Sequence, residues 1–313
     1  MTDSPLGLSH TASLGDEATH LDFDRPPSAL RYMVRAVLPT SRPRHLTPLV
    51  TARWHGHRPD ARSLAQFHRM TGDASGGDDD ATLPLLYPHT FGFRLTMAVL
   101  THPRFPVPIW GVLQTRNHLA QHRPIAADAS LDFETRVLPG RAVPKGAEFD
   151  VRTTVHVDGT MAWESVVTFF ARGRFGEPDA PSPAARSPGD FGDAIAEWTL
   201  ADADHVRFGR FTGDYNGIHL WDWYARRMGF RRALYHPQRV LGLCLARLPS
   251  PAHRPAVTGK VKLDAWIKGP VPHAARVRLH ASTTGTATTF ALFPDDETRP
   301  AIVGRLHATK EPD

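Results

Sequence analysis

A carboxylate and an imidazole stand five residues apart in residues 212–219, which read Thr-Gly-Asp-Tyr-Asn-Gly-Ile-His. These two groups belong to Asp214 and His219, and the residues between them include Asn216 and Gly217, which favour turns. Such a turn can hold a carboxylate and an imidazole around one water molecule and let them exchange a proton with it. Adding water to a polarised double bond needs this chemistry. The Asp/His motif (residues 212–219) therefore predicts Asp214 and His219 as catalytic residues.

The landmarks around this motif occur twice, so the sequence contains an internal repeat. Each copy contains a tryptophan, then a short amphipathic helix that ends in Arg-x-Thr-Gly-Asp. The first copy is Trp54 with residues 60–73, and the second is Trp198 with residues 202–214. Further on, Leu-Leu-Tyr-Pro-His in the first copy corresponds to Ala-Leu-Tyr-His-Pro in the second. Each precedes an apolar run of helical character, residues 93–100 and 240–248. Matched landmarks in the same order predict a duplication.

The two copies differ at the candidate catalytic positions. Asp73 corresponds to Asp214, but the position five residues later holds Asp78 where the second copy has His219. Asp78 lies in an acidic, glycine-rich stretch that offers no imidazole. We therefore expect the C-terminal copy to be catalytic and the N-terminal copy to be degenerate.

Strand-like sequence follows each helical run. Residues 149–157 and 163–169 alternate apolar and polar side chains around Asp158-Gly159, a hairpin-turn signal. Four segments play the same part in the second half: residues 257–267, 275–280, 288–293 and 301–308. A helix followed by strands, twice, predicts an α+β fold made of two similar units. We expect their sheets to join edge to edge, because each unit alone exposes an unpaired strand.

Composition divides the chain into four parts. Residues 1–25 are rich in Ser, Thr, Asp and Gly and are predicted to form a disordered tail. Residues 26–175 form the N-terminal repeat, and residues 191–313 form the C-terminal repeat. The Pro-, Ser-, Ala- and Gly-rich residues 176–190 are predicted to be the linker between them.

The charge of the chain favours an anionic partner. Residues 1–25 hold five acidic residues and one basic residue, which leaves +9 on the rest of the chain against +5 for the whole. The phosphates of an acyl-CoA or of an acyl-carrier-protein arm suit such a surface. Zinc-finger spacing, RNP-like aromatic motifs and Lys/Arg blocks are missing from the sequence, so we expect no nucleic-acid binding.

Other features exclude several classes of protein. The single cysteine, Cys244, lies in an apolar run, which rules out an internal disulfide and fits a buried thiol in a reducing cytoplasm. No apolar run approaches the roughly 20 residues of a membrane span, and residues 1–25 lack the regions of a secretory signal. The 18 histidines show no HExxH-type spacing, so the sequence predicts no metal site.

The Asp/His motif resembles the hydratase motif of the MaoC-like (R)-specific enoyl-CoA hydratase/dehydratase family. The resemblance covers most of the chain from about residue 45 onward and includes residues 87–89, 121–125 and 230–248. It implies a double hot-dog fold, in which each of two repeats wraps an antiparallel β-sheet around a long central helix. It also implies a hydro-lyase that adds water reversibly to trans-2-enoyl thioesters without a cofactor. In this family the degenerate half helps to enclose the acyl chain.

The resemblance also implies roles for individual residues. Asp214 and His219 would activate the water that adds to C3 and return a proton to C2. Asn216 would shape the turn and hydrogen-bond within the site. The start of the long helix would supply a backbone N–H to the thioester oxygen as negative charge develops there. Apart from the resemblance, the basic residues Arg231 and Arg232 follow the motif and would either bind the phosphates of coenzyme A or lie on a solvated helix face.

Two residues depart from the family pattern. Pro237 stands where the family usually has a glycine whose N–H faces the oxyanion, and proline has no N–H to donate. The donor would then be the N–H of His236 or Gln238, or the side chain of Tyr235 or Gln238. Gly217 stands where the family usually has a proline, which loosens the turn.

Three functions are compatible with these residues. The leading interpretation is an (R)-specific enoyl-CoA hydratase and 3-hydroxyacyl-CoA dehydratase. The second is a hot-dog thioesterase, although such enzymes use a lone carboxylate rather than Asp-x-Asn-x-x-His. The third is a non-catalytic acyl-thioester-binding or assembly protein, which Pro237 and Gly217 favour. The sequence leaves open the acyl chain length, the choice between coenzyme A and a carrier protein, and the pairing of chains into a homodimer.

Overall fold

The computed structural model describes residues 19–37, 46–47, 50–72, 81–178, 180–249 and 260–309. The first half contains, in chain order, β1 (Thr19–Phe23), α1 (Ala29–Val37), β2 (Val50–His57), α2 (Ala61–Thr71), α3 (Leu86–Leu100), the 3-10 turn η1 (Ile109–Gly111), β3 (Val112–Gln121), β4 (Leu131–Val137), β5 (Arg141–Val143), β6 (Gly146–Val157) and β7 (Thr160–Arg172). The second half contains the 3-10 turn η2 (Pro183–Ala185), β8 (Ala194–Thr199), α4 (His205–Thr212), α5 (Gly217–Leu220), α6 (Asp222–Arg227), α7 (Pro237–Leu245), β9 (Lys260–Ile267), β10 (Arg276–Thr284), β11 (Ala287–Pro294) and β12 (Ile302–Thr309).

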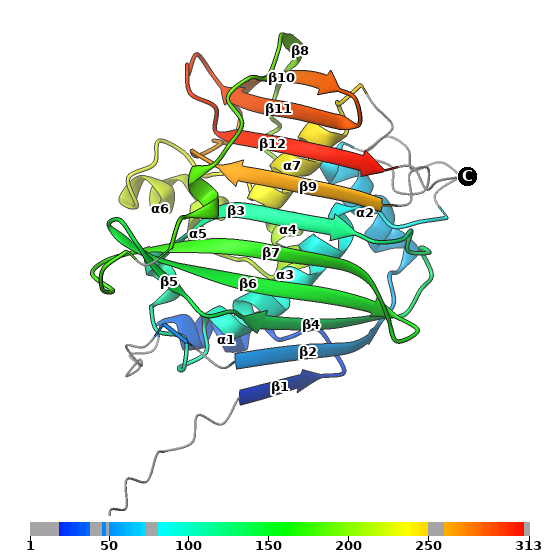
Figure 1. Ribbon diagram of the computed structural model, residues 1–313, viewed down its shortest axis with the longest axis vertical. Helices are drawn as coiled ribbons and strands as arrows, with labels where there is room; N and C mark the ends of the chain where they lie inside the picture. Colours follow the sequence, from blue (N-terminus) through cyan, green and yellow to red (C-terminus); the bar gives the residue numbers. More distant parts are fainter. Residues whose placement is uncertain are drawn as a thin grey trace, which may run out of the picture.

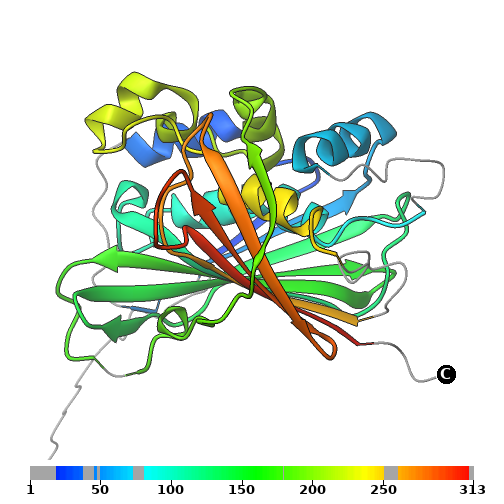
Figure 2. The same cartoon turned by 90° about the horizontal axis from the view of Figure 1, so that it is seen from above.

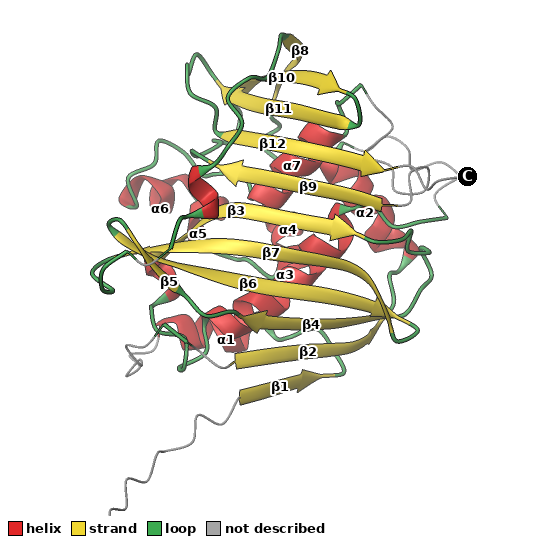
Figure 3. Cartoon of the chain, viewed as in Figure 1, coloured by secondary structure: helices red, strands yellow, loops and turns green. Residues whose placement is uncertain are grey.

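Within these segments, 12 strands form one sheet in the order β1-β2-β4-β6-β7-β3-β9-β12-β11-β10-β8, with β5 paired to β6 off this path. The order β2-β4-β6-β7-β3 of the first half recurs as β8-β10-β11-β12-β9 in the second, as the repeated landmarks predicted. The α-helices lie on one side of the sheet (Figure 2), and α3 and α7 run behind its two halves (Figures 1 and 3). The predicted α+β double hot-dog fold is confirmed.

The central helix of the first half, α3, is buried nearly all round. Arg94 is its one residue that is not buried. Because almost every side of α3 contacts protein, its sequence shows no amphipathic period, and the apolar run at residues 93–100 marks only its second part. Trp163 on β7 donates its Nε1–H to the Leu85 carbonyl at 3.0 Å, which holds the start of α3 against the sheet.

The strands predicted from alternation are confirmed. β6 and β7 form the hairpin around Asp158-Gly159, and β9 to β12 correspond to the four segments predicted in the second half, with ends that differ by a few residues. The second central helix, α7, begins at Pro237. A proline at the first helical position has no N–H to lose, so it starts the helix without cost.

The described part of the chain begins inside the segment that was predicted to be a disordered tail. Residues 1–18 lie outside the described residues, but Thr19–Phe23 form β1, which pairs in parallel with β2. Leu21 and Phe23 alternate with polar residues and pack against the core. The tail prediction was therefore wrong from residue 19 onward, because the acidic composition concealed a short alternating strand. Asp73 and Asp78 also lie outside the described residues.

The sequence also led to expectations about the single cysteine and about membrane-spanning helices. Cys244 is a free, buried thiol, and burial raises its pKa to about 12, as expected for an unreactive core residue. No helix in the described segments combines the length and the apolar composition that crossing a membrane requires.

The two halves join where β3 pairs with β9 in the antiparallel direction. This pairing is the edge-to-edge contact that the sequence predicted. At the join, Asp264 on β9 accepts a hydrogen bond from Arg116 and lies 2.9 Å from His118 Nδ1, both on β3. Burial opposes ionisation of Asp264, but its contacts with His118 and Arg116 hold its pKa below the ordinary 3.8.

We expect Asp264→Asn to lower the free energy of unfolding at neutral pH by about 1–3 kcal/mol, because Arg116 and His118 lose a charged acceptor. A carboxyl with a lowered folded-state pKa stabilises the protein above its unfolded-state pKa and loses that contribution as pH falls through the folded-state value. The difference from wild type should therefore shrink below about pH 3.8. Urea unfolding at several pH values measures this difference, and Asp296→Asn, at an exposed position, is the control. Equal free energies of unfolding for wild type and Asp264→Asn would show that Asp264 does not stabilise the join.

Candidate active site

The Asp/His motif begins where α4 ends. Gly213 closes α4 in the left-handed conformation, with φ of 71°, and its N–H bonds to the Gly209 carbonyl at 2.8 Å. A Cβ at this position would lie 2.1 Å from the Tyr32 hydroxyl oxygen. Both the backbone conformation and the lack of space therefore require glycine.

A relay of side chains then fixes the turn. The Asp214 N–H donates to Thr212 Oγ1 at 3.0 Å, and Asp214 Oδ1 accepts from the Asn216 N–H at 3.0 Å. Asn216 Oδ1 in turn accepts from the Ile218 N–H at 3.2 Å and caps α5. Since these bonds hold Oδ1 of Asp214, its second oxygen is left to face His219.

His219 has a defined tautomer. Its Nδ1 lies 2.9 Å from the Leu234 carbonyl oxygen, which can only accept, so Nδ1 carries the hydrogen. Its Nε2 lies 3.5 Å from Asp214 Oδ2. Burial works against the charged form of Asp214, but the contact with His219 and the nearby His236 lower its pKa to about 2. Asp214 is thus ionised at neutral pH and faces Nε2 of His219.

His236 supports this pair from within the protein. Its ring stacks on that of His219, with centroids 4.1 Å apart, and its Nε2 donates to the Asp214 carbonyl oxygen at 3.1 Å. Burial and the neighbouring His219 lower the pKa of His236 to about 3, so its ring is neutral at neutral pH. His236 therefore holds the backbone of Asp214.

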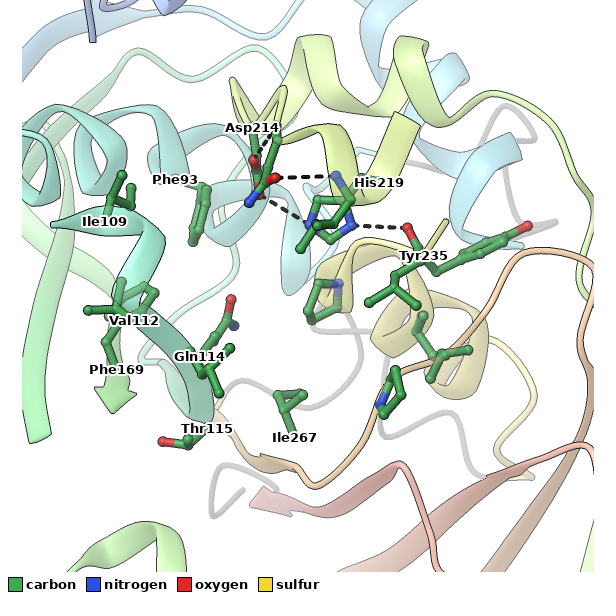
Figure 4. A pocket seen from close by; sticks show the side chains of 18 of the residues that line it. Phe93, Ile109, Val112, Gln114, Thr115, Phe169, Asp214, His219, Tyr235 and Ile267 are labelled. Carbon is green, nitrogen blue, oxygen red and sulfur yellow. Dashed lines mark hydrogen bonds and ion pairs between the residues drawn. The ribbon is translucent and has the colours of Figure 1, made fainter. Parts of the chain in front are cut away.

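The pair lies at the polar end of an apolar cavity of about 460 Å³ that both halves line. Figure 4 shows Asp214 and His219 beside Phe93 and above Val112 and Phe169; these three residues come from α3, β3 and β7 of the first half. Helix α1 adds Met33 and Ala36, and the second half adds an apolar group: Ile218, Phe230, Leu234, Val240, Ile267, Val271 and Ile302. The first half thus supplies much of the cavity wall.

The other predicted site residues lie in different positions. Asn216, Tyr235 and Pro237 line the cavity, but the Tyr235 hydroxyl donates to the Ala201 carbonyl, away from Asp214 (Figure 4). Gln238 is buried in the first turn of α7 and its side chain is not part of the cavity lining.

Arg231 and Arg232 are exposed on the segment before α7 and also lie outside the cavity lining. They follow Phe230, which does line the cavity. The two arginines therefore stand beside the cavity rather than within it.

Gly217, the second departure from the family pattern, has a local explanation. A Cβ at Gly217 would lie 2.8 Å from the Tyr224 ring and 3.2 Å from the Trp221 ring. The aromatic side chains of the neighbouring segment take the space that a larger residue would need. Asn216 meanwhile caps the turn, so the turn is held by side-chain hydrogen bonds instead of a proline ring.

Tyr32 is a site residue that the sequence did not reveal. It is 1% exposed on α1, and its hydroxyl donates to the Gly213 carbonyl at 2.6 Å across a separation of 181 residues. Residues 26–45 carry no motif, so the one available signal was the amphipathic pattern of α1. Tyr32 ties the first half directly to the Asp/His motif.

We expect Tyr32→Phe to loosen the Asp/His motif, because it leaves the buried Gly213 carbonyl without its donor. Amide hydrogen exchange of residues 212–219 should become about 5- to 30-fold faster, which corresponds to about 1–2 kcal/mol. Tyr87→Phe is the matched control, since the buried Tyr87 hydroxyl contacts His57 in the first half, at 3.2 Å. Equal exchange in both variants would show that Tyr32 does not hold the motif.

Known proteins share this fold and part of this sequence. No protein-family model matches the chain. The 3-hydroxyacyl-thioester dehydratase X of Mycobacterium tuberculosis is 28% identical over 189 residues, which span 60% of this chain and 66% of that protein. The crystal structure of HtdX from the same organism matches with a TM-score of 0.68 at 22% identity, over 82% of this chain and 99% of that one. A MaoC-like dehydratase from Phytophthora capsici matches with a TM-score of 0.69 at 17% identity, over 83% and 95% of the two chains. Sequence and fold together confirm the resemblance to the MaoC-like dehydratases that the Asp/His motif predicted.

Proposed function

We propose that this chain is an (R)-specific enoyl-CoA hydratase and 3-hydroxyacyl-CoA dehydratase, a hydro-lyase that adds water reversibly to trans-2-enoyl thioesters. One observation carries the proposal: Asp214 Oδ2 and His219 Nε2 lie 3.5 Å apart at the polar end of an apolar cavity. The name of the 28% identical relative, a 3-hydroxyacyl-thioester dehydratase, supports it. The (R) stereochemistry follows from the resemblance.

The hydrogen bonds of the site define how water would be held. Since the Nδ1–H of His219 is bound to the Leu234 carbonyl, its Nε2 and Asp214 Oδ2 are both acceptors. A water within reach of both donates one hydrogen to each. Its oxygen lone pairs then face the cavity, where C3 of the enoyl group would lie.

The pKa of Asp214 assigns the proton transfers. At about 2, the carboxylate is a weak base, so His219 Nε2 takes the proton as the water oxygen bonds to C3. Asp214 stabilises the resulting imidazolium, and the same nitrogen returns the proton to C2. The sum is hydroxyl on C3 and hydrogen on C2, and the reverse sequence is dehydration.

The thioester oxygen needs a donor as negative charge develops on it. Pro237 and Val240 line the cavity, which brings the start of α7 to the reacting group. The N–H of Gln238 lies in the first helical turn, where backbone amides lack an acceptor within the helix. We assign the donor role to this amide, and such a donor lowers the barrier by about 3–4 kcal/mol.

The thioester would enter with its apolar chain against α1, α3 and β3 and its phosphate-bearing arm toward the surface. Arg231 and Arg232 stand beside Phe230 of the cavity and are our candidates for binding that arm. Coenzyme A and a carrier-protein arm both present phosphate there. A role in fatty acid metabolism, a cytoplasmic location and pairing into a homodimer stay predictions from the sequence.

We expect Asp214→Asn and His219→Ala each to lower kcat/KM for crotonyl-CoA and for a medium-chain trans-2-enoyl-CoA by about 10²–10⁴-fold. The loss of enoyl absorbance measures turnover. His55→Ala is the control, because His55 also contacts carboxylates, those of Asp22 and Asp132, but on the exposed face of β2. Full activity in either site variant would refute the mechanism. Binding without turnover by wild type would favour the non-catalytic acyl-thioester binder.

We expect Val112→Phe to narrow the cavity between Phe93 and Phe169 and so to select against long acyl chains. The KM for the medium-chain substrate should rise about 10-fold or more, whereas crotonyl-CoA should be nearly unaffected, because an overfilled cavity costs about 1–3 kcal/mol. Ile195→Phe, on the exposed part of β8, is the control for an added ring. An equal change for both substrates would place the acyl chain elsewhere.

A further inference from the structure

A second group of metal-ligating side chains lies outside the Asp/His motif. Asp202 follows β8, His205 opens α4, and His273 lies in the loop between β9 and β10. One possible ligand atom from each of the three lies within 4.8 Å of the other two. The side chain of His273 is 3% exposed, while that of Asp202 is 66% exposed and open to solvent.

The hydrogen bond of His273 directs a lone pair at Asp202. His273 Nε2 lies 3.1 Å from the Leu234 carbonyl oxygen, an acceptor, so Nε2 carries the hydrogen of the neutral ring. Nδ1 is then an acceptor, and it lies 3.3 Å from Asp202 Oδ1, a second acceptor. Two acceptors this close repel each other unless a hydrogen-bond donor or a cation lies between them.

The two histidine rings of this group contact each other. The His205 ring meets that of His273 edge to face, with centroids 4.8 Å apart. Buried Nδ1 atoms of both histidines have no hydrogen-bond partner among the described residues.

We propose that Asp202, His205 and His273 bind a divalent transition-metal ion, with zinc as the fitting ion and solvent as the fourth ligand. Two imidazoles and one carboxylate are a ligand set that zinc favours. Zinc bonds of about 2.0–2.2 Å at tetrahedral angles place two ligand atoms about 3.3–3.6 Å apart. The 3.3 Å between His273 Nδ1 and Asp202 Oδ1 meets this requirement.

The surroundings of the three residues also suit an ion. The Leu234 carbonyl orients His273 through its other ring nitrogen, as second partners of metal-binding histidines do. Arg239 opposes a cation at His273, but its guanidinium is bound to the Met70 and Ala203 carbonyls and stacks on Tyr235. The exposed Asp202 provides both negative charge and access from solvent. The site does not depend on the proposed hydratase activity.

Zinc and cobalt titration of the chelator-treated full-length protein tests the site, with a chromogenic chelator as competitor and the visible spectrum of bound Co²⁺ as a second readout. Wild type should bind one zinc per chain. Asp202→Asn and His205→Gln should each weaken zinc binding by at least about tenfold. Loss of a residue that only hydrogen-bonds to a metal ligand already weakens metal binding by about this factor, and loss of the ligand itself should weaken it at least as much. Thermal unfolding without metal checks that each variant is folded.

Two controls locate the ion. Asp204→Asn keeps the ligands but removes a nearby charge, and Asp214→Asn disrupts the group of Asp214, His219 and His236, which also has ligand-type atoms within 4.8 Å of one another. Both variants should bind zinc within about twofold of wild type, since neither removes a proposed ligand. Equal zinc binding by wild type and Asp202→Asn would overturn the proposal, and so would loss of binding in Asp214→Asn alone.

Discussion

Pairing of β3 with β9, from Arg116 opposite Trp266 to Gln121 opposite Val261, is the contact on which the rest of the structure depends. It joins the seven strands of the first half and the five strands of the second into one continuous sheet, and it brings α3 of the first half beside α7 of the second. The cavity lies at this junction, with walls from both halves and its polar end from the second. Without the join, Asp214 and His219 would have no apolar enclosure to act in.

The two copies contribute different parts of the candidate site. The second copy carries the carboxylate and the imidazole, and the first offers apolar surface from α1, α3 and β7. In the second copy, the Leu234 carbonyl accepts hydrogen bonds from both His219 Nδ1 and His273 Nε2. One carbonyl thus sets the tautomer of a candidate catalytic imidazole and of a candidate metal ligand.

Much of the fold could be predicted from local sequence patterns, because half-buried strands alternate apolar and polar residues and turns favour particular residue types. Alternation located β6, β7 and β9 to β12, and the Arg-x-Thr-Gly-Asp repeat revealed the duplication. Burial on all sides concealed the first part of α3, since a helix without a polar face has no period. Strand β1 was missed because its two apolar residues are set among acidic ones.

The candidate site divides in the same way. Asp214 and His219 were predictable because a short turn joins them, whereas Tyr32 meets Gly213 through tertiary packing alone. The same holds for His273, whose partners Asp202 and Leu234 lie on other segments. Positions next to a motif in sequence did not all reach the cavity, because Arg231 and Arg232 lie on its outside. Closeness in sequence therefore does not predict closeness in space for residues that lie on different helices, strands or loops.

The separation between joined residues also has a consequence for how the chain is made. His118 on β3 is synthesised 146 residues before its partner Asp264, and Tyr32 precedes Gly213 by 181. Until the second half emerges from the ribosome, the first half presents an open strand edge and an uncovered apolar wall, the features that promote aggregation. Contacts so distant in sequence also slow folding. The edge of β3 therefore stays unpaired during synthesis until β9 has been made.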